Sequence, residues 1–106
     1  MTQNSDSVFV NPNSTQSMTD KIVLSANTAL NNRRNVKGVT CFGAPSAIQG
    51  PSDAEKAKPI LFSNLKDAEQ AGSKLAVIAC FDDPFLPEAR ETISTPTIGI
   101  GWAAFT

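Results

Sequence analysis

The sequence contains no histidine and only two cysteines, Cys41 and Cys80, among its 106 residues. Without an imidazole, the chain cannot supply a His general base, a Cys–His dyad or the His ligands on which most zinc sites depend. Neither cysteine belongs to a CxxC motif, so a thioredoxin-like dithiol is excluded. A soft metal centre would need more thiolate or imidazole ligands than remain. These absences leave a lone thiol as the main reactive group.

Long apolar runs and an excess of positive charge are also missing. No segment approaches the roughly 18 apolar residues that span a membrane. The chain has nine Lys and Arg residues against ten Asp and Glu residues, a net charge of -1. We therefore expect neither a membrane nor a nucleic acid as a partner. The N-terminal stretch MTQNSDS is polar and does not resemble a secretory signal, which predicts a cytoplasmic protein with reduced thiols.

Short apolar runs alternate with helix-like segments along a chain long enough for one domain. Strands are expected near residues 7–10, 36–40, 75–79 and 97–100, and helices near residues 17–31, 52–71 and 87–93. In the first helix, an apolar residue recurs every four positions from Met18 to Leu30. This order predicts an α/β fold with a doubly wound, four-stranded parallel sheet and helices on both faces.

The second predicted helix carries three local signals. Ser52 and Glu55 have the spacing of a capping box, and Gly72 is placed to end the helix. Pro59 either kinks the helix or starts a new turn of it. We therefore expect one long, irregular helical segment between the second and third strands.

Polar or reactive residues follow three of the predicted strands. They are the loop Asn11-Pro12-Asn13-Ser14, then Cys41, and then Cys80-Phe81-Asp82-Asp83, which ends the apolar run AVIA. In parallel sheets, ligands bind outside the carboxyl ends of the strands. The sequence therefore predicts a candidate site at this edge.

Cys80 has a structural and a chemical interpretation. A free cysteine packs as a small hydrophobe, and that alone could explain its place after an apolar strand. A phosphatase loop would need an arginine six residues later, where Leu86 follows Cys80 and Ala47 follows Cys41. The GxGxxA pattern at residues 99–104 is a weak nucleotide signal without a following helix. Proton abstraction next to a carbonyl remains, with turn amides as donors to the enolate.

Three separated segments of the sequence carry further information: VFVNPNSTQSM at residues 8–18, AIQG at residues 47–50, and the blocks VIACFDDP, LPEARE and TPTIGIGWAA within residues 77–104. They resemble the hydantoin racemase group of the aspartate/glutamate racemase superfamily. They occur in the order and spacing of the family and cover nearly all of the chain beyond residue 7. The resemblance implies a cofactor-independent racemase of hydantoins, allantoin or related cyclic amides.

The resemblance also implies roles for single residues. Such enzymes have two α/β lobes, and each lobe contributes one cysteine to opposite faces of the stereocentre. Cys80 matches the cysteine of the first lobe. Asn11, Asn13 and Ser14 match the loop that lines the cleft, and Phe81 and Asp82 match the turn whose amides face the substrate.

The chain departs from the family pattern in two respects. Its length corresponds to one lobe, so we expect residues 8–106 to form the first lobe, after a flexible N-terminus of residues 1–7, with the second lobe absent. Trp102 stands where the family usually has Glu. Cys41 should lie two strands from Cys80 and is expected to be a buried, inert thiol. An alternative is a truncated, inactive domain that binds a small amide ligand, a second-lobe partner or a second copy of itself.

Overall fold

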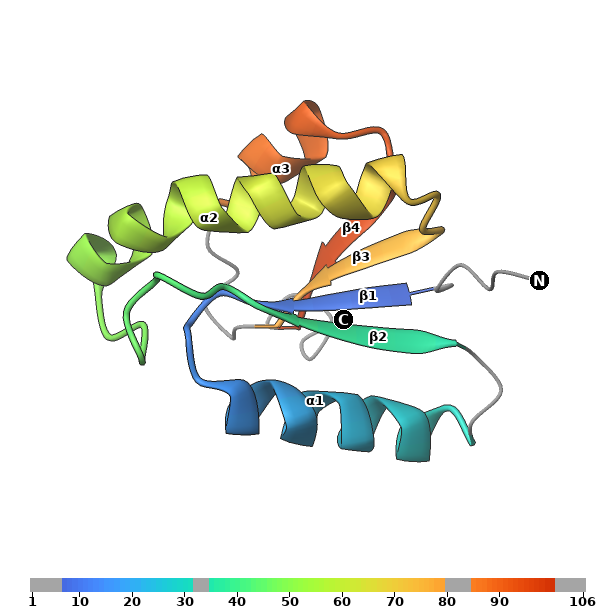
Figure 1. The fold of residues 1–106 in the computed structure, drawn as a ribbon. Coiled ribbons are helices and arrows are strands. Elements are labelled where there is room, and N and C mark those ends of the chain that lie inside the picture. Colours follow the sequence, from blue (N-terminus) through green and yellow to red (C-terminus); the bar gives the residue numbers. More distant parts are fainter. Residues whose placement is uncertain (1–6, 32–34, 80–84, 101–106) are drawn as a thin grey trace.

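Four parallel strands and three helices alternate along the chain, in a computed structural model that describes residues 7–31, 35–79 and 85–100 (Figure 1). The elements are β1 (Ser7–Asn11), α1 (Gln16–Ala29), β2 (Val36–Thr40), α2 (Pro51–Gln70), β3 (Leu75–Ile78), α3 (Leu86–Thr92) and β4 (Thr97–Gly99). Each predicted strand and helix is confirmed, with bounds that differ by a few residues at most.

The strands lie in the order β2-β1-β3-β4, and all neighbouring pairs are parallel. The chain moves outward from β1 to β2 and then returns to the other side of β1 to form β3. Figure 1 shows the consequence, with α1 on one face of the sheet and α2 and α3 on the other. The predicted doubly wound α/β sheet is therefore confirmed.

The buried core lies between the sheet and α2. Because successive side chains of a strand point to opposite faces, Val8 and Val10 of β1 join Leu61 and Leu65 of α2 in one apolar cluster. Phe9 points to the other face, toward α1, and lines an open groove there. The two faces of the sheet are thus unequally covered.

The second helix runs without interruption through Pro59 from Pro51 to Gln70. The predicted capping box is wrong, because Gly50 is the residue at the N-cap and no side chain caps the helix there. Gly72 does end the helix, with a positive φ of 81°. Its N–H donates to Glu69 O and that of Ser73 to Ala68 O, a Schellman motif.

The first helix contacts the sheet through few residues. Thr19 is the one fully buried residue of α1, and it lies against Gly38 of β2, where an added Cβ would come within 2.8 Å of Thr19 Cγ2. The apolar repeat from Met18 to Leu30 borders the groove, and Met18 is 45% exposed. No helix within the described residues is long and apolar enough to cross a membrane.

Candidate functional site

A groove of about 720 Å³ runs between α1 and the sheet, with one end at the carboxyl ends of β1 and β3. Apolar side chains of α1 and of the sheet make most of its wall. The residues at that end are Asn11, which ends β1, Pro12 and Asn13 after it, Ala47 and Ile48 after β2, and Ala79 after β3. The groove therefore occupies the edge at which the sequence predicted a site, and its volume suits a small organic ligand.

The parallel register brings the predicted strand ends together. Asn11 pairs with Thr40 of β2, and Val10 pairs with Ile78 of β3. The chain leaving β3 is held there, because the N–H of Ala79 donates to Val10 O at 2.9 Å. Ala79 thus reaches the groove beside the loop that follows β1.

Asn11 is 1% exposed and its amide is used inside the protein. Its Nδ2 donates to Asn13 Oδ1 at 2.8 Å, to Thr19 Oγ1 at 3.0 Å and to Thr15 O at 3.3 Å. Its Oδ1 accepts from the N–H of Asn13 at 3.1 Å. These bonds give Asn11 a clear part in shaping the loop, whereas a contact between Asn11 and a ligand stays a prediction.

Asn13 lines the groove, and the oxygen and nitrogen of its side-chain amide are engaged unequally. Its Oδ1 is occupied by Asn11 Nδ2 and by the N–H of Thr15 at 2.9 Å, which forms an Asx turn. Among the described residues, the partner of its Nδ2 is Met18 Sδ at 3.5 Å, and a thioether sulfur is a weak acceptor. Asn13 can therefore donate to a carbonyl oxygen in the groove.

Ser14 follows in the same loop without lining the groove. Its N–H donates to Pro45 O at 3.1 Å, and the hydroxyl of Thr15 donates to Ser46 O at 2.8 Å. The N–H of Cys41 lies 3.2 Å from Asn11 O and 3.2 Å from Asn13 O. The loops after β1 and β2 are thus joined by hydrogen bonds, which explains how Ala47 and Ile48 come to line the groove.

Cys41 is fully buried on the opposite face of the sheet, toward α2. Asn64 of α2 donates to its Sγ at 3.5 Å. Burial raises the pKa of the Cys41 thiol, and the hydrogen bond from Asn64 opposes that rise only in part. The predicted burial of Cys41 is confirmed, and this thiol does not line the groove.

Cys80, Phe81 and Asp82 lie outside the described residues. On one side of them, Ala79 lines the groove. On the other side, Phe85 takes a φ of 58° and packs edge-to-face on Phe62, with 6.3 Å between ring centroids. Ala79 therefore lies beside the groove, whereas Phe85 lies against α2.

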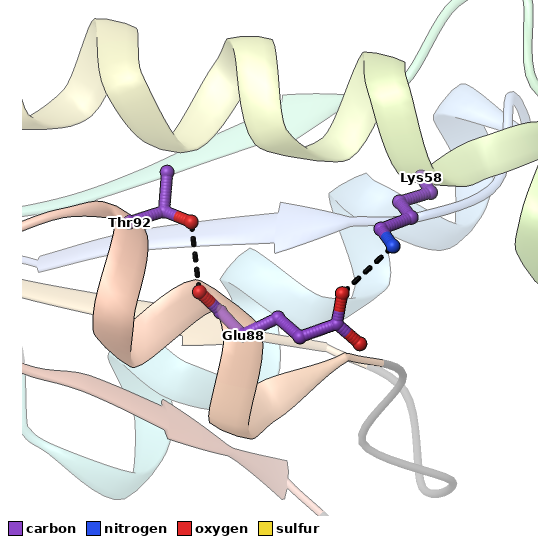
Figure 2. A network of polar contacts seen from close by, with 3 residues as sticks. All are labelled: Lys58, Glu88 and Thr92. Atoms are coloured by element: carbon purple, nitrogen blue, oxygen red, sulfur yellow. Dashed lines mark hydrogen bonds and ion pairs between the residues drawn. The ribbon is translucent and has the colours of Figure 1, made fainter.

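A cation covers this aromatic pair. Lys58 Nζ lies 4.8 Å from the centroid of Phe85 and 2.7 Å from an oxygen of Glu88. Figure 2 shows this ion pair, together with the hydroxyl of Thr92 donating to the backbone oxygen of Glu88. The sequence analysis missed this cluster, for which the only signal was the four-residue spacing of Lys58 and Phe62 on a helix.

Two hydroxyls behind the loop were also missed. Thr19 of α1 and Thr40 of β2 are buried, and their Oγ1 atoms lie 2.6 Å apart. The only signal in the sequence was that each is a polar residue within a segment predicted to be a helix or a strand. Within the described ranges, no three His, Cys, Asp or Glu side chains are grouped so as to hold a metal ion.

Comparison with known proteins gives consistent matches. The family model of Asp/Glu/hydantoin racemases matches residues 8–106. A hydantoin racemase of Rhizobium meliloti is 38% identical over 96 residues, which cover 91% of this chain and 40% of the relative. A hydantoin racemase of Pseudomonas sp. (strain NS671) is 33% identical over 91 residues, which cover 86% of this chain and 36% of the relative.

Among solved structures, the allantoin racemase from Klebsiella pneumoniae is similar to this chain, with a TM-score of 0.87 and 30% sequence identity. The similarity covers 92% of this chain and 40% of that one. The chain thus spans about 40% of the length of such relatives.

Proposed function

Because the chain belongs to the Asp/Glu/hydantoin racemase family, we propose that residues 8–106 form the first of two lobes of a cofactor-independent racemase of cyclic amides. Hydantoins and allantoin are the proposed substrate class, after the names of the similar proteins. Residues 1–7 are proposed as a short N-terminal extension, of which Ser7 already belongs to β1. The observation that carries the proposal is a groove of small-ligand size at the strand ends, reached by Asn13 and by Ala79, the residue before Cys80.

In the proposed reaction, Cys80 acts as a thiolate base. Its sulfur takes the proton from the stereogenic carbon, so that a C–H bond breaks and an S–H bond forms. The electron pair moves onto the adjacent carbonyl oxygen as an enolate. Donors aimed at that oxygen lower the barrier. We assign this part to Asn13 Nδ2 and to the backbone amides of Phe81 and Asp82. The N–H groups of Asn13, Ser14 and Thr15 already donate within the protein.

Inversion requires a second proton donor on the opposite face of the same carbon. A thiol there gives its proton to the carbon and is left as a thiolate, which balances the reaction. Cys41 is a poor candidate, because it is buried on the α2 side of the sheet. Since the chain has only two cysteines, the second thiol must come from a second lobe or from a partner chain. A free thiolate also suits a reducing compartment such as the cytoplasm.

Deuterium exchange tests this function. The chain is incubated in deuterated buffer with one enantiomer of a 5-substituted hydantoin or of allantoin. Loss of the α-proton signal is followed by NMR, and its rate is compared with the rate in the absence of protein. If a single thiol acts on one face of the substrate, the α-proton should be replaced by deuterium faster than the optical rotation is lost. An exchange rate equal to the protein-free rate, for both substrates and with a candidate second lobe added, would contradict the proposal.

A second candidate is a catalytically inactive domain that binds a small amide ligand or a partner chain. The observation that favours it is the match to only about 40% of the similar racemases. Titration with a hydantoin, followed by NMR, would then shift the signals of Asn13 and Ala79 without any exchange of the α-proton. Size measurement by light scattering would separate a monomer from a self-associated form.

A further inference from the structure

A directed chain of hydrogen bonds lies behind the loop that carries Asn13. Thr40 Oγ1 donates to Gln16 Oε1 at 2.7 Å, so the hydroxyl of Thr19 must be the donor in its 2.6 Å contact with Thr40 Oγ1. Thr19 Oγ1 then accepts from Asn11 Nδ2 at 3.0 Å. The order of donation therefore runs from Asn11 through Thr19 and Thr40 to Gln16, and such chains strengthen their members mutually.

The chain of hydrogen bonds is buried from Asn11 to Thr40, ends at the exposed Gln16, and is complete. Thr19 is 1% exposed, and no buried side-chain nitrogen or oxygen among the described residues lacks a partner. It joins the start of α1 to the ends of β1 and β2, which lie side by side in Figure 1. The hydrogen bonds therefore link three separate elements, β1, α1 and β2.

The absence of a side chain on Gly38 permits this contact. A Cβ at Gly38 would lie 2.8 Å from Thr19 Cγ2 and 2.4 Å from Val23 Cγ2. Both distances are far below an ordinary carbon–carbon contact of roughly 3.5–4.0 Å. The backbone of β2 thus allows α1 to approach closely enough for Thr19 to reach Thr40.

We infer that Thr19 and Thr40 are positioning residues for the ligand-binding loop, an inference that rests on the proposed function of that loop. The Thr19 hydroxyl fixes the amide of Asn11, and Asn11 Nδ2 in turn fixes Asn13 Oδ1. Asn13 lines the groove, and with its Oδ1 held by Asn11 and Thr15 its Nδ2 keeps only the weak bond to Met18 Sδ among the described residues. Neither threonine touches the ligand; each acts through Asn11.

The first test is hydrogen exchange in Thr19→Val, which keeps the shape of the side chain and removes its hydroxyl. The amides of Asn13 and Thr15 donate to the side-chain oxygens of Asn11 and Asn13, and they report on the loop. We expect the variant to accelerate exchange of these two amides at least about tenfold more than exchange of the Ala76 amide. The N–H of Ala76 serves as the reference because it donates to the distant Pro96 O. Equal acceleration at Ala76, or none at Asn13 and Thr15, would overturn the inference.

Two matched variants make the test specific. Thr19→Ser restores the hydroxyl and should return loop exchange to the wild-type rate. Thr28→Val removes a hydroxyl from the exposed side of the same helix, where it donates to Leu24 O, and should leave loop exchange unchanged. Loop acceleration in Thr28→Val as large as in Thr19→Val would mean that helix stability, not the hydroxyl chain, is being measured.

The wild-type protein offers a test that needs no variant to fold. The side-chain amide protons of Asn11 should exchange at least about a hundredfold more slowly than those of the exposed Gln16, whose Nε2 donates to Asp20. Equal rates would refute the hydrogen-bond chain. If the protein deuterates a hydantoin, Thr19→Val should raise KM more than it lowers kcat, and Thr19→Ser should restore KM. A wild type without this activity contradicts the proposed function, while the exchange rates still decide the positioning role.

Discussion

Replacing Gly38 with alanine should destabilise the protein by about 2 kcal/mol. The new Cβ would lie 2.4 Å from Val23 Cγ2 and 2.8 Å from Thr19 Cγ2, so α1 must retreat by about 1 Å to restore ordinary contact. Both neighbours are β-branched and stiff at χ1 in a helix, so they cannot rotate away easily. Overpacking of this kind costs about 1–3 kcal/mol.

Two further effects enter the estimate for Gly38→Ala. The retreat of α1 would lengthen the contact between Thr19 and Thr40 and weaken a hydrogen bond worth about 1 kcal/mol. Alanine also lowers the conformational entropy of the unfolded chain, which stabilises the folded protein by about 0.4–1 kcal/mol. The remaining loss of about 2 kcal/mol corresponds to a fall of roughly 8–16 °C in Tm for a domain of this size.

Urea unfolding followed by far-UV circular dichroism measures this loss. The control is Gly50→Ala, because an added Cβ there has no atom within 4 Å and the residue is in an extended conformation. We expect the control to stay within about 0.5 kcal/mol of the wild type. If Gly38→Ala unfolds at the same urea concentration as Gly50→Ala, the close approach of α1 to β2 is not a packing constraint.

Three other changes have definite expected outcomes. Burial raises the pKa of the Cys41 thiol, so the stability that the neutral thiol contributes is complete below pH 9.0 and is lost as the pH rises through the folded-state pKa. The urea midpoint of the wild type should therefore fall more between pH 7.5 and pH 10 than the midpoint of Cys41→Ala. Equal falls in the two proteins would contradict this. Gly72→Ala should cost about 1 kcal/mol in the same urea assay, because the residue keeps a φ of 81° at the end of α2, and a wild-type midpoint would be evidence against strain there. The hydrogen-bonded carboxylate of Glu88 raises the pKa of the partly exposed Lys58, yet Glu88→Gln should leave the urea midpoint unchanged, because surface ion pairs are screened. A clear fall would show that the ion pair supports the contact of Lys58 with Phe85.

The order of elements could be predicted from the sequence because it depends on local hydrophobic patterns. The apolar runs at residues 7–10 and 75–79 are bounded by polar turns and identified two strands, and Gly72 marked the end of α2 correctly. These features depend on neighbours within a few residues.

The environment of the site depended on contacts that no local pattern contains. The repeat from Met18 to Leu30 has the spacing of a buried helical stripe, but it borders the groove because α1 covers only part of its face of the sheet. Thr19 and Thr40 are 21 positions apart, and only the packing of α1 on β2 brings their hydroxyls together. Asn11 was predicted as a groove residue, yet its buried hydrogen bonds could not be foreseen.

We propose above that Cys80, which follows Ala79 in the sequence, is the base. The most direct measurement compares α-proton exchange of a hydantoin or allantoin in deuterated buffer for the wild type, Cys80→Ser and Cys41→Ala at equal concentration, with folding verified by circular dichroism. We expect the exchange rate with Cys80→Ser to fall to the protein-free rate, a loss of at least about a hundredfold, because the base is removed. Cys41→Ala should keep the wild-type rate. Exchange that survives in Cys80→Ser, or disappears only in Cys41→Ala, would contradict the account.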